Sequence, residues 1–315
     1  MSLRMFLLTC SLVIAAVPAF SQYADKPAAL PLKYKFTQGD QFEVTQHEQQ
    51  ESYLSLDGVT QRTSNRRDAV LVLILRQVSA TEATIDASFK QITLLSSSED
   101  QKISVNTTTG DNSLYNRLFK ALTGKTFTLV LQQNGTIKSV TGLNPIFDDM
   151  IAAVPEVKAD EKPILKKFLE SQFGPEALKA SLGLVMPYYP PQAVQVNDSW
   201  MNQLYTSDFY HGRIDNFWKL SYGDKYSAKL SNAGKFTTDA SEEVDLGGGD
   251  RGFVDLSGEI TGNYVVDPQT GWPSMCITHT ELNGNYIYKA AKKRKQDIKV
   301  PVRVVMNASY QFKHL

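Results

Sequence analysis

The sequence predicts a mainly β protein of the α+β class, in which two curved antiparallel β-sheet units flank a small helical layer. A long stretch near the C-terminus alternates strictly between apolar and polar side chains, and shorter alternating stretches recur on both sides of the chain's middle. Apolar residues at helical spacing gather in that middle. Alternation with a period of two is typical of antiparallel strands that have one buried and one solvated face.

Residues 1–21 have the three regions of a secretory signal peptide. Arg4 supplies a positive charge, residues 5–17 form an apolar run too short for a membrane-spanning helix, and Ala19 and Ser21 place small side chains before a cleavage point. No later stretch is apolar for long enough to cross a membrane. We therefore expect export through the Sec pathway, removal of the signal peptide, and a mature protein that is periplasmic or secreted.

Residues 22–142 are assigned to a first antiparallel β unit with one short helix. Apolar side chains occupy every second position at residues 83–89 and again at residues 127–131. The second stretch leads into Asn134-Gly135, a pair that favours tight hairpin turns because it accepts positive φ angles. Apolar residues at helical spacing in 114–122 predict the helix, with Gly124 as its stop.

Residues 143–191 are assigned to a helical segment followed by a proline-rich connector. Residues 146–151 and 164–169 each present one short apolar face, and Pro175 suits the first turn of a third helix. The stretch 186–191 contains stacked prolines, which exclude helix and predict an extended chain. We place the boundary of the second β unit at this connector.

Residues 192–315 are assigned to a second antiparallel β unit. Its firmest element is a strand that begins at Ile298, where the even-numbered positions are apolar and the odd-numbered positions mostly polar. Each β unit opens on a short turn motif, Gly39-Asp40 or Asn197-Asp198, and later contains a strand–turn–strand that ends in a glycine. This recurrence favours an internal duplication, although the spacings of the two units differ.

Composition and motifs exclude several function classes. The full sequence has 33 basic and 33 acidic side chains, whereas a nucleic-acid-binding protein needs a basic face. Its four histidines have no local metal-binding spacing, and no nucleophile elbow or phosphate-binding loop is present. After signal cleavage Cys276 is the only cysteine, for which we expect a half-buried and inert thiol. We assign no catalytic residue, no metal site and no cofactor.

Two surface or core features suggest binding. Aromatic residues crowd the region that follows the connector, and they either line an apolar site for a lipid or glycan or form the core between sheets. Our candidate ligand-binding residues come from this crowd: Tyr188, Tyr189, Trp200 and Trp218. The basic cluster at residues 289–295 either contacts anionic head groups or polysaccharide, or keeps a hairpin tip soluble and blocks edge pairing.

Several short motifs resemble those of an uncharacterised family of exported proteins of the Bacteroidetes type, known only as a domain of unknown function. The final motif is usually Gly-Asp-Ser-Trp in that family, and Asn197 stands in place of its glycine here, which still tolerates a left-handed turn. The resemblance implies no activity, because the family has none established. The motifs are Leu32-x-Tyr34-x-Phe36, Gly39-Asp40, Thr126-Phe127-Thr128-Leu129, Asn134-Gly135-Thr136, Val140-x-Gly142, Pro190-Pro191 and Val196-Asn197-Asp198-Ser199-Trp200.

We therefore expect a non-catalytic exported protein that binds a hydrophobic ligand, a lipid or an envelope protein. One alternative is an envelope hydrolase whose site forms only in three dimensions, for example where His211 meets Ser207, Asp208 or Asp215. The other alternative is a purely structural component of the envelope. An apolar cavity favours binding, a polar cleft around His211 favours catalysis, and a filled core favours the structural role.

Overall fold

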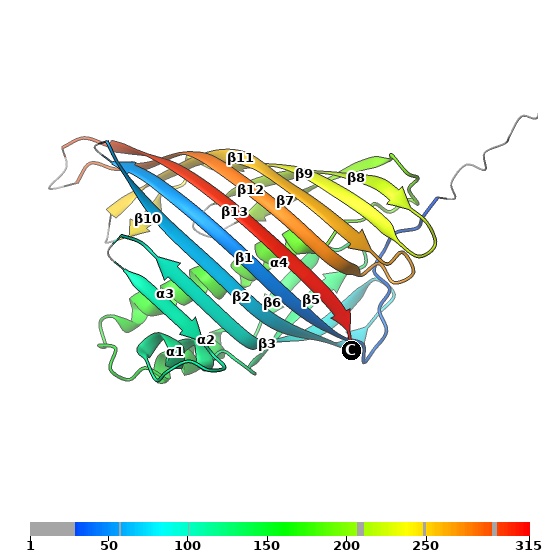
Figure 1. Cartoon of the computed structure of the whole chain (residues 1–315), viewed down its shortest axis with the longest axis horizontal. Helices are drawn as coiled ribbons and strands as arrows, with labels where there is room; N and C mark the ends of the chain where they lie inside the picture. The colour runs from blue at the N-terminus through cyan, green and yellow to red at the C-terminus, as the bar shows by residue number, and fades with distance from the viewer. Residues whose placement is uncertain (1–28, 57, 100, 207–210, 248–249, 292–294) are drawn as a thin grey trace, which may run out of the picture.

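The computed structural model describes residues 29–56, 58–99, 101–206, 211–247, 250–291 and 295–315. The signal peptide predicted from the sequence lies outside these residues. The described chain forms one antiparallel sheet of 13 strands, and its helices lie against one side of that sheet (Figure 1). The mainly β class is therefore confirmed.

The order of elements along the chain is strands, then helices, then strands, as the sequence predicts. The helices are α1 (Leu114–Lys120), α2 (Asn144–Ala152), α3 (Lys162–Phe173) and α4 (Pro175–Val185). The strands are β1 (Gln41–Leu56), β2 (Val59–Val78), β3 (Glu82–Ser97), β4 (Lys102–Asn106), β5 (Thr126–Gln132), β6 (Ile137–Thr141), β7 (Ser199–Thr206), β8 (Gly212–Gly223), β9 (Ala228–Thr238), β10 (Val244–Gly247), β11 (Asp250–Val266), β12 (Pro273–Tyr288) and β13 (Ile298–His314).

The sheet is an open meander whose centre joins the two ends of the chain. Its order is β6-β5-β3-β2-β1-β13-β12-β11-β9-β8-β7, with β4 beside β3 and β10 beside β11. Figure 1 shows blue β1 beside red β13, and their ladder runs from Phe42 opposite His314 to Leu54 opposite Val302. The two predicted β units are thus the two halves of one sheet, and β6 and β7 are its free edges. The helices α2, α3 and α4 fall between these edges in the sequence.

The strands and helices predicted locally are present, but the apolar face predicted for residues 164–169 is only partly buried, because Ile164 and Phe168 are exposed while Leu169 is enclosed. Every second residue of β13 is buried from Val300 to Val304, and Ala308 and Tyr310 continue the buried face. Ile298 is exposed because it lies at the last pair of the β12–β13 ladder, at the end of the sheet. Pro175 opens α4 as expected, and Asn197 has a φ of 79°, which confirms the left-handed turn.

The interior of the sheet contains two apolar clusters. The larger cluster joins the helices to strands of both halves of the sheet, and it contains a group of aromatic rings in which the ring centroid of Tyr34 lies 5.2 Å from those of Tyr189 and Trp272. The smaller cluster lies on strands of the second half. The buried polar side chains that lie on described strands belong to the same half of the sheet, namely Asn216, Asn232, Thr238, Thr278 and Thr280.

Candidate functional site

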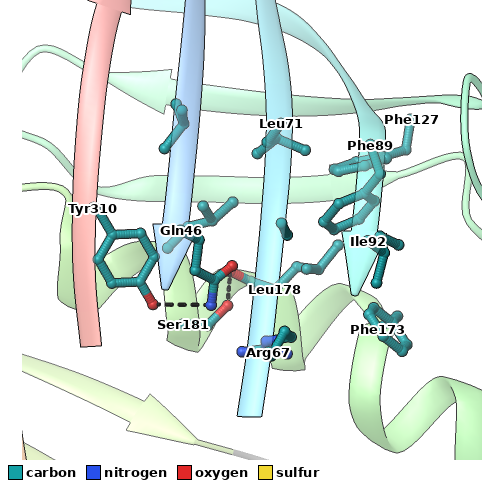
Figure 2. A pocket seen from close by; sticks show the side chains of 13 residues that line it. Gln46, Arg67, Leu71, Phe89, Ile92, Phe127, Phe173, Leu178, Ser181 and Tyr310 are labelled. Carbon is teal, nitrogen blue, oxygen red and sulfur yellow. Dashed lines mark hydrogen bonds between the residues drawn. The ribbon is translucent and has the colours of Figure 1, made fainter. Parts of the chain in front are cut away.

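A narrow apolar pocket lies between the inner face of β1–β3 and the helices α3 and α4 (Figure 2). Its cavity volume is about 40 Å³. The rings of Phe89 and Phe173 face each other edge to face with centroids 6.2 Å apart. Apolar side chains form most of the wall, namely Val44, Ala69, Leu71, Phe89, Ile92, Phe127, Phe173, Leu178 and Leu182.

The register of the sheet creates this pocket. The ladder places Val44 opposite Leu71, and Leu71 in turn opposite Phe89, so these side chains point to the same inner face. Two residue pairs along the ladder, on the same inner face, Ala69 lies opposite Gln46. Because alanine is much smaller than its neighbours on this face, we attribute the space beneath the helices to that position.

One end of the pocket is polar. Figure 2 shows Tyr310, Gln46, Ser181 and Arg67 gathered there, whereas Phe89 and Phe127 lie toward the other end. These polar side chains come from β13, β1, α4 and β2, so they are distant in the sequence. The pocket therefore has an apolar body and a hydrogen-bonding end, which is the arrangement that suits an amphiphilic molecule.

The polar end is held by a hydrogen-bond network around Glu48. A terminal nitrogen of Arg67 donates to Glu48 Oε2 at 2.7 Å, and Gln46 Nε2 donates to the same oxygen at 3.0 Å. Gln46 Nε2 also lies 3.3 Å from the hydroxyl of Tyr310. Arg67 Nε is buried and has no hydrogen-bond partner within the described structure. A buried donor without a partner is costly, so this N–H group is available to an acceptor.

The charges at the polar end balance. Burial opposes the charge of Arg67, but Glu48 and Tyr310 outweigh it and raise the pKa of the guanidinium above its ordinary value. Burial first, and then Glu48, raise the pKa of the Tyr310 hydroxyl far above its ordinary value, so that it stays a neutral phenol. Arg67 and Glu48 therefore form one ion pair, and the pocket end carries no net charge.

A second hollow, which we call the edge groove, lies on the other side of α4. Its cavity volume is about 210 Å³. It lies between the two free edges of the sheet, and α4 provides one of its sides. Its lining residues are Gly135, Thr136, Ile137, Glu176, Lys179, Ala180, Gly183, Met186, Tyr188, Asn202, Gln203, Leu204 and Tyr205.

The four ligand-binding residues proposed from the sequence lie apart from the apolar pocket. Tyr188 lines the edge groove, and its carbonyl accepts a hydrogen bond of 2.7 Å from the indole of Trp200. Tyr189 and Trp218 are each 1% exposed. The hydroxyl of Tyr189 donates a hydrogen bond of 2.7 Å to Gly271 O, and the indole Nε1 of Trp218 donates one of 2.7 Å to Asn202 Oδ1. Three of the four thus anchor the core, and a role in ligand binding stays a prediction.

Sequence reasoning missed the polar end of the apolar pocket. A signal was present in the sequence. Gln46 and Glu48 follow Val44 at every second position of β1, so they lie on the same inward face although their side chains are polar. A polar residue at an inward position is informative, but only if the strand pairing is known. Arg67 becomes its neighbour through the β1–β2 register, which places Glu48 opposite Arg67.

The features that could support catalysis or a charged interface are placed as follows. His211 Nδ1 lies 3.0 Å from Glu242 Oε2, Asp215 accepts hydrogen bonds from Gln203 and Arg213, and residues 207–208 lie outside the described structure. No cluster of three potential metal ligands occurs among the described residues. Of the basic cluster, residues 292–294 are likewise not described.

The one cysteine among the described residues is buried and chemically shielded. Cys276 is fully enclosed on β12, and burial raises the pKa of its thiol to about 12. A thiol reacts as its thiolate, which is scarce at neutral pH when the pKa is this high. The thiol is thus more completely buried than the half-buried position expected from the sequence.

The likeness of the chain to each of the following three solved structures is weak. A structure entitled "Lipid-protein interactions in lipovitellin" is 11% identical with a TM-score of 0.49, and the match covers 89% of this chain but 25% of that one. The chain therefore spans about a quarter of the length of that relative. The attachment invasion locus protein of Yersinia pestis is 6% identical, covering 88% and 100% of the two chains, with a TM-score of 0.15. An outer membrane channel from Pseudomonas putida F1 is 7% identical, covering 89% and 97%, with a TM-score of 0.21.

These scores are too low to support an argument about function. None of the helices in the described part of the chain has the length and apolar character to cross a membrane.

No curated protein matches the sequence. A family model does match, over residues 80–273, and its description is a family of unknown function, DUF6263. This match spans more than half of the sequence and confirms the resemblance to an uncharacterised family, while the bacterial group stays a prediction. The chain belongs to the family of unknown function DUF6263.

Proposed function

We propose that the protein binds an amphiphilic molecule, a linear apolar chain with a small uncharged polar group, in the apolar pocket between β1–β3 and α4. The observation that carries the proposal is the pocket's composition: an apolar wall that ends in an ion pair with an unpartnered buried donor. An enclosed pocket with apolar sides and few polar groups at one end is the usual form of a small-molecule site. No catalytic step is part of the proposal.

The polar group of the ligand is assigned by the donors at the pocket end. Arg67 Nε can donate but cannot accept, so its partner on the ligand is an acceptor oxygen. Because Glu48 already compensates the charge of Arg67, a neutral acceptor fits better than a carboxylate, which Glu48 would repel. An ester or ketone oxygen at the end of an acyl chain meets both conditions.

Ligand entry requires the helices to move. A cavity of about 40 Å³ is far below the roughly 300 Å³ at which sites for small molecules begin. Phe173 at the end of α3 and Leu178 on α4 form the helical side of the pocket, and Gly174 separates the two helices. We infer that α3 and α4 swing outward at this junction, which enlarges the pocket without opening the sheet.

Two serines on these helices provide a matched test. Ser181 lines the pocket and bonds back to Leu178 O at 3.2 Å, whereas Ser171 bonds back to Phe168 O at 2.8 Å and does not line it. We expect Ser181→Phe to fill the pocket and weaken binding of a dansyl-labelled lauric acid methyl ester by about tenfold or more. Ser171→Phe, the control, is expected to bind as the wild type does, as measured by fluorescence titration. Equal affinities for both variants, or no binding by the wild type, would contradict the proposal.

The polar end is tested separately by varying the ligand. The double variant Arg67→Met/Glu48→Met removes the ion pair without leaving an isolated buried charge. In the wild type the methyl ester is expected to bind about tenfold more tightly than a dansyl-labelled alkane of equal length, because a bond to a charged donor is gained. In the double variant the two ligands should bind equally. An ester preference that survives in the double variant would refute the role of Arg67.

We also propose that the chain is exported and acts outside the cytoplasm, a proposal supported by Arg4 and the apolar run that follows it. Periplasmic extracts of a Gram-negative host that expresses the full chain should contain a product whose N-terminal residue is Gln22. A product that keeps Met1 and stays in the cytoplasm would contradict export.

A further inference from the structure

β7 is a free edge of the sheet without the usual protection. It pairs with β8 from Ser199 opposite Lys219 to Thr206 opposite Gly212, and no backbone hydrogen bond joins residues 200–205 to any other described element. In an antiparallel ladder every second residue of an edge strand directs its N–H and C=O groups away from its neighbour. Free edges are normally blocked by lysine, proline or bulges. The sequence of β7, SWMNQLYT, contains no charge and no proline, and its ladder with β8 has no register shift.

The edge groove runs along this strand. Residues 202–205 of β7 form one wall, and Thr136 and Ile137 at the other free edge of the sheet also line the groove. Between these edges α4 presents Glu176, Lys179, Ala180 and Gly183, which lie on one face at helical spacing.

Small residues on that helical face leave space beside the strand. Ala180 has only a methyl group, and Gly183 has none; a Cβ on Gly183 would meet a methyl group of Leu204 at an ordinary 3.5 Å. The groove is therefore shaped by the absence of side chains on α4 beside a strand that still has hydrogen-bonding capacity. A globular partner would meet both sheet edges and α4, whereas a single extended chain needs only the width of one strand.

The electrical character of the groove indicates a neutral occupant. Lys179 Nζ lies 3.6 Å from Glu176 Oε2, so the charges of these two side chains compensate each other at the rim of the groove. The wall formed by β7 has no ionisable group other than the Tyr205 phenol. Tyr205 of this wall is 67% exposed and Met201, which does not line the groove, is 58% exposed, so apolar area continues past the groove along the strand. Both features disfavour an acidic or basic partner.

We propose that the edge groove binds an extended, uncharged peptide segment of another protein, which adds to β7 as an antiparallel strand and lies against α4. Main-chain hydrogen bonds to β7 supply the affinity, and alternate apolar side chains of the peptide rest on Ala180 and Gly183. This site lies on the opposite side of α4 from the apolar pocket, so the proposal does not depend on the ligand proposed above.

The experiment uses the full chain and one defined peptide. The probe is a fluorescein-labelled, end-capped peptide with the sequence of β7 itself, SWMNQLYT. If the peptide pairs antiparallel to β7 with the two Gln203 residues opposite each other, Met201 of the chain lies opposite the tyrosine of the peptide, and the two side chains share the outer face. Binding is followed by fluorescence anisotropy. Two further peptides carry N-methyl groups at either the odd or the even positions, which block hydrogen bonding along only one edge of the peptide each.

Strand addition predicts that one of the two N-methylated peptides loses binding by at least about tenfold and that the other keeps it. Ala180→Phe should fill the groove and weaken the unmodified peptide by a similar factor. Ala177→Phe is the matched control on the same helix, since Ala177 is half-buried and lines neither hollow, and it should leave binding unchanged. Hydrogen exchange of the β7 amides should slow when the unmodified peptide is bound.

Three outcomes would overturn the proposal. The first is the absence of peptide binding up to about 1 mM. The second is equal binding of both N-methylated peptides, which would indicate contact with side chains only. The third is a concentration-dependent dimer of the chain, observed by sedimentation and lost in Ala180→Phe, because the occupant would then be a second copy.

Discussion

Gly271 provides a test of how the chain's N-terminal segment is fixed to the sheet. It lies in the turn between β11 and β12 with a φ of 75°, a region that L-residues enter at a cost. A Cβ at this position would lie 2.0 Å from Lys33 O and 2.8 Å from Tyr34 N, so Gly271→Ala must push the segment that carries Tyr34 away from the turn.

The expected loss has two parts. The left-handed conformation costs about 1 kcal/mol for alanine. Separating the segments breaks the hydrogen bond that Lys35 N donates to Thr270 O (2.8 Å). It also disturbs the hydrogen bond that the buried hydroxyl of Tyr189 donates to Gly271 O (2.7 Å). Together these are worth about 2–4 kcal/mol, so we expect Gly271→Ala to lower the free energy of unfolding by about 3–5 kcal/mol.

Gly124 is the matched control, because it has nearly the same φ, 74°, and no atom lies within 4 Å of the position that a Cβ would occupy. Gly124→Ala should therefore show only the conformational cost, about 1 kcal/mol. Urea unfolding of both variants, followed by tryptophan fluorescence, measures the difference. Equal losses of stability in the two variants would refute the reasoning, since the clash with Lys33 would then have no energetic consequence.

Two further predictions concern ionisable groups. Cys276 should react with a thiol reagent such as dithionitrobenzoate only after unfolding, because burial raises its pKa to about 12; rapid labelling of the native protein at pH 8 would contradict this. Hydrogen bonds from Arg62 and then Ser64 lower the pKa of Glu51, so its contribution to stability is complete above the ordinary value of 4.5 and is lost as the pH falls below it. Arg62→Gln should flatten this acid dependence in urea titrations; an unchanged pH profile would argue against the pair.

The elements of the fold were accessible from the sequence because their signals are local. The alternation that begins at Ile298 predicted β13, and Pro175 predicted the start of α4. Which face of a strand or which side of a helix a residue occupies follows from its spacing to its neighbours along the chain. The turn at Asn197 is local for the same reason, since few residues tolerate a positive φ.

The pairing of the strands was not accessible in the same way. The sequence predicted two β units, and either could have closed on itself, because any strand edge can accept a new neighbour. The structure instead joins β1 to β13 at the centre and leaves β6 and β7 as edges. The apolar pocket and the edge groove both follow from this choice, since one lies under β1 and β2 and the other lies between the free edges.

The candidate sites show the same division. Aromatic density alone suggested Tyr188, Tyr189, Trp200 and Trp218, but aromatic residues fill cores as readily as they line sites, and of these four Tyr188 alone lines either the apolar pocket or the edge groove. Arg67 gave no signal of its own among the many charged residues of β2. Its environment depends on Glu48 and Tyr310, which two separate ladders bring beside it.

The sequence by itself thus determined which segments are strands or helices, where they turn and which side of each strand is apolar. Only the tertiary structure decided which strands are neighbours, and with them the polar end of the pocket and the open edge of β7. The physical reason is that backbone periodicity is encoded residue by residue, whereas a site is made by inward-facing side chains whose proximity depends on long-range hydrogen-bonded register.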